Sequence, residues 1–197
     1  MRQLGAGAGR RLGRVPPIDD ATRPRTAGSV ELEPHQRAAG DHLRMVHDHF
    51  RHQLETLTRA VEALRDGSED GAGGVEAVRA GVHGLAPSLT AQQVAGLCGQ
   101  VCRFLTMHHS IEDQTMFPAV ATMQRYAPVA ARLAEEHVVV HAHLERVDDL
   151  AVAVRTDPER VGELVTAVAD LRADLESHFT YEETEMAEPL GLLGLGP

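Results

Sequence analysis

The chain has 197 residues, enough for one domain with additional length at an end, and it contains no Trp, four Phe and two Tyr. Leu, Val and Ala must fill its core, which favours a helix bundle over a sheet. The net charge of −10 argues against nucleic acid or an anionic membrane surface as a partner. The apolar runs are too short to span a bilayer and the first residues do not resemble a secretory signal, so we expect a cytoplasmic protein.

The first third of the chain divides into a polar segment and a long helix. Residues 1–33 are rich in Gly, Arg and Pro and lack apolar periodicity, which predicts a disordered tail. From Pro34 to about Arg65, apolar residues recur every three or four positions, as in an amphipathic helix. A glycine-rich connection follows, and a short helix is expected over residues 75–85.

A second long helix is predicted to begin at Thr90. Gln93 follows three residues later, which is the pattern of a capping box. The helix should continue toward Met123, and Pro118 should bend it near that end.

The third helix is expected to follow Pro128, which suits a first helical turn, and to run to about residue 154. Asp157 and Pro158 then provide a cap and a first position for a fourth helix, which should end near residue 187. Residues 191–197 are predicted to be a short unstructured tail. The expected fold is therefore all-α, an up-down-up-down four-helix bundle over residues 34–190 with a disordered N-terminal tail.

The two cysteines, Cys98 and Cys102, lie four residues apart on the second predicted helix. This spacing is poor for a disulfide, and two thiols in a helical core fit a reducing cytoplasm. We interpret them as small core residues.

Histidine is frequent, with 12 residues, and the second helix carries one of two clear metal-binding patterns. His108 and Glu112 lie four residues apart and so share one helical face. An imidazole and a carboxylate that can bridge suit iron, manganese or zinc. His109 and Asp113 form a second pair, rotated by about 100°, and are expected behind the ligands or facing a loop.

The third helix carries the other pattern, His137 and His141, which share a face within an apolar stripe. Two imidazoles there would be costly without a metal or another partner. The pair resembles the histidines of zinc metalloproteases, but the nearby Glu136 precedes the first histidine, so the general base of that class is missing.

The first and fourth helices add further donors. His47 lies beside the apolar stripe of the first helix, and His178 is followed by Glu182 at four residues and Glu183 at five. Both glutamates remain candidates for one bridging position. Tyr181 lies between them and could bring a phenol near a metal.

Taken in order, these motifs resemble the hemerythrin-like (HHE cation-binding) family. The flanking residues resemble its actinobacterial branch most, through Val46-His47-Asp48, Cys102-Arg103-Phe104, Met116-Phe117-Pro118 and Glu188-Pro189-Leu190. The resemblance covers about residues 35–195. The metal ligands that it implies are His47, His108, Glu112, His137, His141, His178 and either Glu182 or Glu183.

The resemblance implies a centre of two iron ions joined by an oxo or hydroxo bridge. Five imidazoles, two bridging carboxylates and that bridge would fill all but one position of two six-coordinate irons. The remaining position could bind dioxygen, hydrogen peroxide or nitric oxide. Zinc is a poorer candidate because it favours four ligands.

Two classes of function follow from this resemblance. One is redox processing of a small oxidant, including catalase-like peroxide disproportionation, with His109, Tyr181 and Glu183 as candidate proton relays. The alternative is a non-enzymatic oxygen carrier, iron store or sensor. A carrier favours an apolar pocket around the open position, whereas a peroxide enzyme tolerates polar groups there.

Overall fold

The computed structural model describes residues 13–69 and 89–195, with the side chains of residues 68 and 69 excepted. The short helix predicted over residues 75–85 lies outside this part of the chain. Within it every long element is helical, and the elements are α1 (Pro34–Glu69), α3 (Ala91–Ile111), α4 (Phe117–Ala121), α5 (Ala127–Ala153) and α6 (Val161–Leu193). The all-helical prediction is confirmed.

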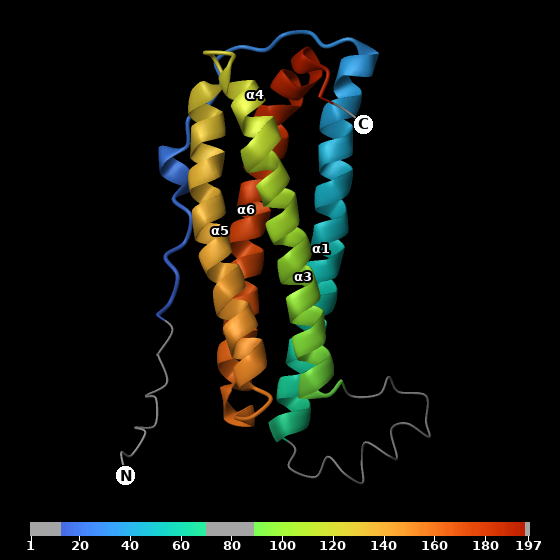
Figure 1. Ribbon diagram of the computed structural model, residues 1–197, viewed down its shortest axis with the longest axis vertical. Helices are drawn as coiled ribbons and strands as arrows, with labels where there is room; N and C mark the ends of the chain where they lie inside the picture. The colour runs from blue at the N-terminus through green and yellow to red at the C-terminus, as the bar shows by residue number, and fades with distance from the viewer. Residues whose placement is uncertain (1–12, 70–88, 196–197) are drawn as a thin grey trace, which may run out of the picture.

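The four long helices form an antiparallel bundle (Figure 1). Helix α1 packs against α3 and α6, and α5 packs against the same two helices from the other side. The helices alternate in direction along the chain, as predicted. Each of them therefore presents one stripe of side chains to a common interior.

Most helix starts agree with the sequence. Thr90 caps α3 and forms a capping box with Gln93. Pro128 lies in the first turn of α5. Pro158 opens a short 3-10 turn before α6, although Asp157 makes no side-chain cap hydrogen bond there.

The second predicted helix is not continuous. It is α-helical to Ile111 and then forms a π-helical turn over Glu112–Met116, in which the Phe117 N–H donates to the Glu112 carbonyl five residues earlier. The interruption therefore comes before Pro118, which lies in the first turn of α4. A π-turn adds a residue to the helix locally and changes which side chains face inward.

Helix α6 extends past the predicted end near Ala187. It continues through Pro189 and stops at Gly194, which has a left-handed φ of 64°. The extension packs against the start of α1. A Cβ added at Gly191 would lie 2.5 Å from the Gln36 carbonyl oxygen, so this close contact requires glycine. The unstructured C-terminal tail predicted from residue 191 is corrected accordingly.

Residues 13–33, expected to be disordered from their composition, run along the bundle beside α5 and across its end to α1 (Figure 1). Side chains of the bundle bind several of their backbone groups. Ile18 N–H donates to Asp174, and Thr26 N–H donates to Glu185. Arg125 donates to the carbonyl groups of two residues near the end of the segment. Such tertiary partners are invisible in composition, which explains the difference.

The apolar core consists of two clusters, one toward each end of the bundle. One contains Phe50, Leu105, Val140 and Phe179 among its members. The other contains Leu43, Phe117, Leu133 and Met186 among its members. On every long helix, a short stretch between the two clusters contributes polar side chains instead.

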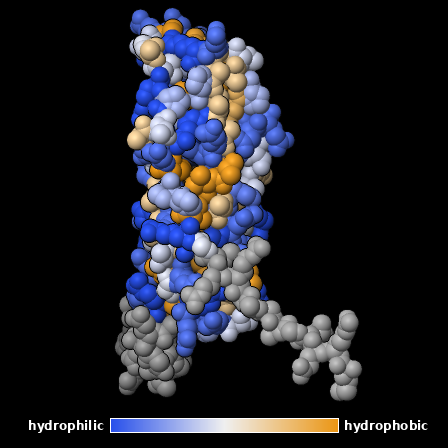
Figure 2. Space-filling view, turned by 90° about the vertical axis from the view of Figure 1, so that its left-hand side faces the viewer, coloured by the Kyte–Doolittle hydropathy of each residue, from blue (hydrophilic) through white to orange (hydrophobic). Residues whose placement is uncertain are grey.

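The exterior is mainly polar. The face seen in Figure 2 is largely hydrophilic, with an apolar patch near the middle of its length. None of the helices in the described ranges has the length and apolar character needed to cross a membrane.

Candidate metal centre

A band of polar side chains lies in the interior between the two apolar clusters. The band is deeply buried. Six of its side chains are at most 5% exposed: His47, His109, Glu112, His137, His178 and Glu182. The His108 side chain is 13% exposed. Burial of so many ionisable groups is unfavourable unless they pair or bind a metal.

The donors form two adjacent groups within the band. His109, His137 and His178 make one group, and His47, His108 and Glu112 make the other. Within each group, one donor atom from every member lies within 4.8 Å of the others. The structure thus brings five imidazoles together from four helices.

Glu112, a member of the second group, also faces the first group. Its Oε1 is 3.1 Å from His108 Nε2, and its Oε2 is 3.6 Å from His137 Nε2. One carboxylate oxygen therefore faces each group, which is the arrangement of a bridging carboxylate.

Glu182 also spans the band. Its Oε2 is 3.4 Å from His47 Nε2 and 3.5 Å from His178 Nε2. These two histidines belong to different groups, so Glu182 on α6 spans both groups, as Glu112 at the start of the π-helical turn does.

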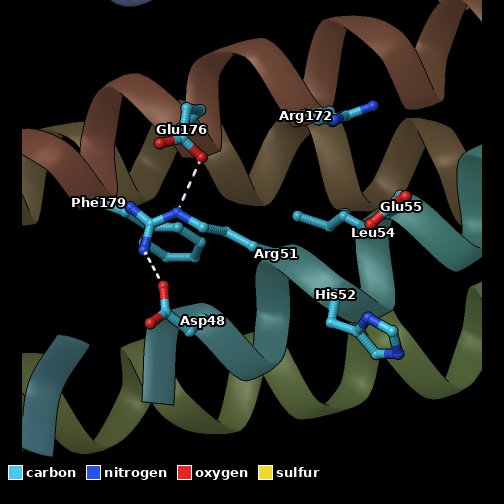
Figure 3. Close-up of a pocket in the computed structure, with 8 residues that line it drawn as sticks. All are labelled: Asp48, Arg51, His52, Leu54, Glu55, Arg172, Glu176 and Phe179. Carbon is cyan, nitrogen blue, oxygen red and sulfur yellow. Dashed lines mark hydrogen bonds and ion pairs between the residues drawn. The ribbon is translucent and has the colours of Figure 1, made fainter. Parts of the chain in front are cut away.

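Glu183 occupies a different position, on the outer side of His47. Its Oε1 is 3.0 Å from His47 Nδ1 and accepts a 2.8 Å hydrogen bond from Arg51. Arg51 also donates to Asp48 and Glu176, and its guanidinium lies over the ring of Phe179 (Figure 3). Glu183 therefore orients an imidazole from outside.

Two further carboxylates support histidines in the same way. Asp113 lies 2.8 Å from His137 Nδ1, and Glu136 lies 3.1 Å from His178 Nδ1. A carboxylate that accepts a hydrogen bond from Nδ1–H fixes the tautomer of the imidazole and leaves Nε2 free to bind a metal. Asp113 thus contacts His137 from outside the donor groups, and its supporting role stays a prediction.

Four of the five imidazoles have a lowered pKa, which favours the neutral form that binds metals. Burial, followed by the charges of neighbouring histidines, lowers the pKa of His47 and of His137 to about 2. The same causes lower the pKa of His108 to about 4 and that of His109 well below its usual value. No deprotonation is therefore needed before these groups bind a cation near neutral pH.

The two interior carboxyl groups shift in the opposite direction. Burial is the main cause that raises the pKa of Glu182, to about 7, and it raises the pKa of Glu112 well above its usual value. The proximity of Glu182 raises the pKa of Glu112 further. Two carboxylates this close favour a shared proton, or a cation that takes its place.

Unpartnered atoms test whether a metal suits this band. His47 Nε2, His108 Nε2, His109 Nε2 and both carboxylate oxygens of Glu112 and Glu182 are buried without a hydrogen-bond partner. Buried polar atoms are rarely left unpaired. Their nitrogen and carboxylate oxygen chemistry is that of non-haem iron and manganese sites, so these residues fit the group that the sequence suggested.

The positions of two predicted residues require correction. His141 lies outside the band: its side chain is 57% exposed and faces Glu145 at 3.4 Å. His109, expected behind the ligands, lies inside the band, with its ring stacked on His137 at 4.1 Å between centroids. The buried face of α5 passes through His137, Val140 and Leu144, and His141 lies one residue, or about 100°, from Val140.

Tyr181 is buried but is turned away from the band. Its hydroxyl donates to the Pro24 carbonyl at 2.7 Å, and the guanidinium of Arg23 lies 4.6 Å from its ring centroid. Its contacts hold the N-terminal segment against α6. This geometry does not fit the proton-relay role expected for Tyr181.

Phenylalanine rings pack around the histidines. Phe179 stacks on His47 at 4.1 Å between centroids, and Phe50 lies 5.1 Å from His108. Phe117 packs at 5.1 Å against His137 in the other group. The two-imidazole end therefore has apolar walls on the sides of α1 and α6.

Fold and site together define a four-helix bundle with an interior histidine and carboxylate site for cations. The sequence comparison agrees: residues 38–190 match the hemerythrin HHE cation binding domain, and the chain belongs to this family. Membership implies that the chain binds cations. Comparisons with curated proteins and with solved structures find no significant match.

Proposed function

We propose that this protein holds two iron ions and binds a small oxidising ligand, such as dioxygen, hydrogen peroxide or nitric oxide. The observation that carries the proposal is the division of five interior imidazoles into two groups, with two carboxylates spanning them. The proposed ligands are His47, His108, His109, Glu112, His137, His178 and Glu182.

The two groups are unequal, which indicates where a small ligand would bind. His109, His137 and His178 supply three imidazoles, whereas His47 and His108 supply two. The coordination count leaves one position open, and we assign it to the end with fewer imidazoles. Two iron ions at this site would supply two electrons for exchange with the bound ligand.

The surroundings of that end favour binding over turnover. Phe50 and Phe179 pack against its two histidines. Of the expected proton relays, His109 faces the cation site and Tyr181 faces Pro24. Apolar walls of this kind limit the access of protons to a bound ligand, as reversible binding requires. We therefore favour a non-enzymatic role in oxygen or iron binding, storage or sensing.

One feature supports peroxide processing as a second candidate. Glu183 contacts His47 Nδ1 and Arg51, and Arg51 lines a surface pocket of about 380 Å³ (Figure 3). This polar connection links the two-imidazole end to solvent. Through it Glu183 could move a proton to or from His47 Nδ1 during catalase-like turnover.

The redox state of the cysteines bears on the cellular location. Cys98 and Cys102 are both free and buried. Unpaired thiols are typical of reducing compartments, so we propose a cytoplasmic protein.

Metal analysis tests the iron content. Protein expressed with ample iron should contain about two irons per chain and absorb in the near ultraviolet through oxo-to-iron charge transfer. The matched variants are His108→Ala, which should lower the iron content, and His141→Ala, which should not. One iron or none in the wild type would refute the two-iron proposal.

The ligand is tested on the same iron-loaded protein. We expect a reversible spectral change when dioxygen is added to the reduced protein and removed again. Rapid oxygen evolution from hydrogen peroxide that Glu183→Gln abolishes would instead support the peroxide candidate. Absence of both responses would refute a small-oxidant function.

A further inference from the structure

Arg23 is a buried cation from the N-terminal segment that reaches the polar band. Its side chain is 4% exposed. Its Nε donates to Glu136 Oε1 at 2.7 Å, and its Nη2 donates to Glu136 Oε2 at 2.8 Å. Its remaining nitrogen contacts Ser177 and Asp20, both at 2.9 Å. The guanidinium therefore donates two parallel hydrogen bonds to the Glu136 carboxylate.

Glu136 transmits this contact to the cation site. It is 1% exposed, and its Oε2 lies 3.1 Å from His178 Nδ1. His178 in turn presents Nε2 to the interior, 3.2 Å from His137 Nε2 and 3.5 Å from Glu182. Arg23, Glu136 and His178 thus form a continuous chain from the N-terminal segment to a proposed ligand.

Neighbouring contacts fix Arg23 in place. On one side of it, Ile18 N–H donates to Asp174. On the other side, the Pro24 carbonyl accepts from Tyr181, and Thr26 N–H donates to Glu185. These backbone contacts on both sides hold the main chain of Arg23 beside Glu136.

A second arginine on Glu136 shows what the first one adds. Arg132 donates through Nε to Glu136 Oε1 at 3.0 Å, while its Nη2 donates to the Asp19 carbonyl instead of the second Glu136 oxygen. A single hydrogen bond leaves the carboxylate free to rotate, whereas the two parallel hydrogen bonds from Arg23 fix the plane of the Glu136 carboxylate. Arg23 therefore determines that Oε2 faces His178.

We propose that Arg23 is a positioning residue of the metal centre, which holds His178 in its binding orientation through Glu136. The N-terminal segment then belongs to the cation-binding unit, although the part of the chain that matches the family begins at residue 38. The inference rests on the proposed metal centre.

Cobalt(II) binding provides the test, because this ion gives shifted proton resonances for imidazole N–H groups bound beside it. The variants are Arg23→Ala and Arg23→Lys, in which a lysine cannot form the two parallel hydrogen bonds. Arg25→Ala is the matched control from the same segment, since Arg25 is 62% exposed and contacts Glu185 instead.

We expect the cobalt-loaded Arg23→Ala protein to lose metal to a chelator about 10–100-fold faster than the wild type, as for other supporting contacts. One shifted N–H resonance, that of His178, should also exchange faster with water. Arg23→Lys should restore only part of both properties, and Arg25→Ala should match the wild type.

Two results separate the possible failures. If Arg23→Ala only lowers the thermal stability of the metal-free protein, with metal loss and N–H exchange unchanged, Arg23 has a purely structural role and the inference is refuted. A wild-type protein that binds no cobalt would overturn the proposed metal centre and the inference together.

Discussion

Replacing Glu182 with Gln should stabilise the metal-free protein and at the same time remove its capacity for two cations. Glu182 is fully buried, and its Oε2 lies within 3.5 Å of His47 and His178, one from each donor group. Gln keeps the shape of the side chain but has no ionisable group. The two effects arise because the same carboxylate is unfavourable without a cation and necessary with one.

The magnitude follows from the pKa of Glu182, which rises from 4.5 to about 7 mainly because of burial. A folded-state pKa above the unfolded value means that the native state binds the additional proton between these pH values. The ionised carboxylate therefore destabilises the fold fully above pH 7, by about 3 kcal/mol. For a chain of this size, the melting temperature of the metal-free variant should rise by roughly 6–12 °C at pH 8.

The assay compares thermal unfolding at pH 8 with and without iron, together with the iron content. The wild type should gain stability from iron, whereas Glu182→Gln should gain little, because ligands stabilise only the state that binds them. Glu183→Gln is the matched control. Glu183 lies outside the donor groups, so this variant should still hold two irons, with an affinity reduced about 10–100-fold.

Two results would contradict this reasoning. A metal-free Glu182→Gln protein that melts below the wild type would mean that the buried carboxylate does not destabilise the fold. Two irons in Glu182→Gln, together with loss of iron in Glu183→Gln, would make Glu183 the bridging residue.

Three further outcomes are expected. His141→Ala should retain its iron while His109→Ala loses one ion, as measured by metal analysis, and the reverse pattern would restore the sequence-based assignment. The free energy of unfolding of the metal-free protein should decrease as the pH falls below 6.5. The reason is that four histidines have a lowered pKa in the native state, so they bind protons in the unfolded chain but remain neutral in the folded protein. The two interior carboxyl groups oppose this loss down to pH 4.5, and below that pH the free energy of unfolding should fall more steeply. Each net proton contributes about 1.4 kcal/mol per pH unit. Urea titrations from pH 4 to 7 that give a constant free energy of unfolding would contradict this expectation. Burial raises the pKa of Cys98 and Cys102 to about 12. Alkylation of these thiols at pH 8 should therefore be slower in the folded protein than in the unfolded chain, on the order of 1,000-fold from the thiolate fraction alone. Rapid labelling of the folded protein, measured by mass spectrometry, would show that these thiols are accessible.

The sequence predicted most of the bundle because its signals are local. The capping box at Thr90 and the prolines at 128 and 158 depend on neighbouring residues alone, and each lies at or near the start of a helical element. The helix end near Ala187 was wrong because the extension of α6 packs against Gln36, which is distant in the sequence.

The sequence also indicated that histidine and carboxylate side chains lie on all four helices, but it could not decide which of several close neighbours face the interior. His109 and His141 exchange their expected roles, with His109 inside the polar band and His141 exposed. Glu182 faces both histidine groups, and Glu183 supports His47 from outside. A shift of one residue turns a helical side chain by about 100°, and only packing against the other helices fixes that rotation.

By itself, the sequence determined an all-helical chain with histidine and carboxylate donors on four helices, because periodicity and ligand spacing are properties of consecutive residues. Only the tertiary structure decided which donors meet, and it added a part of the site that no local pattern contains. Arg23 lies 113 residues before Glu136, in a segment whose composition resembles a disordered tail. A contact over that distance depends on how the bundle packs, so no spacing rule could reveal it.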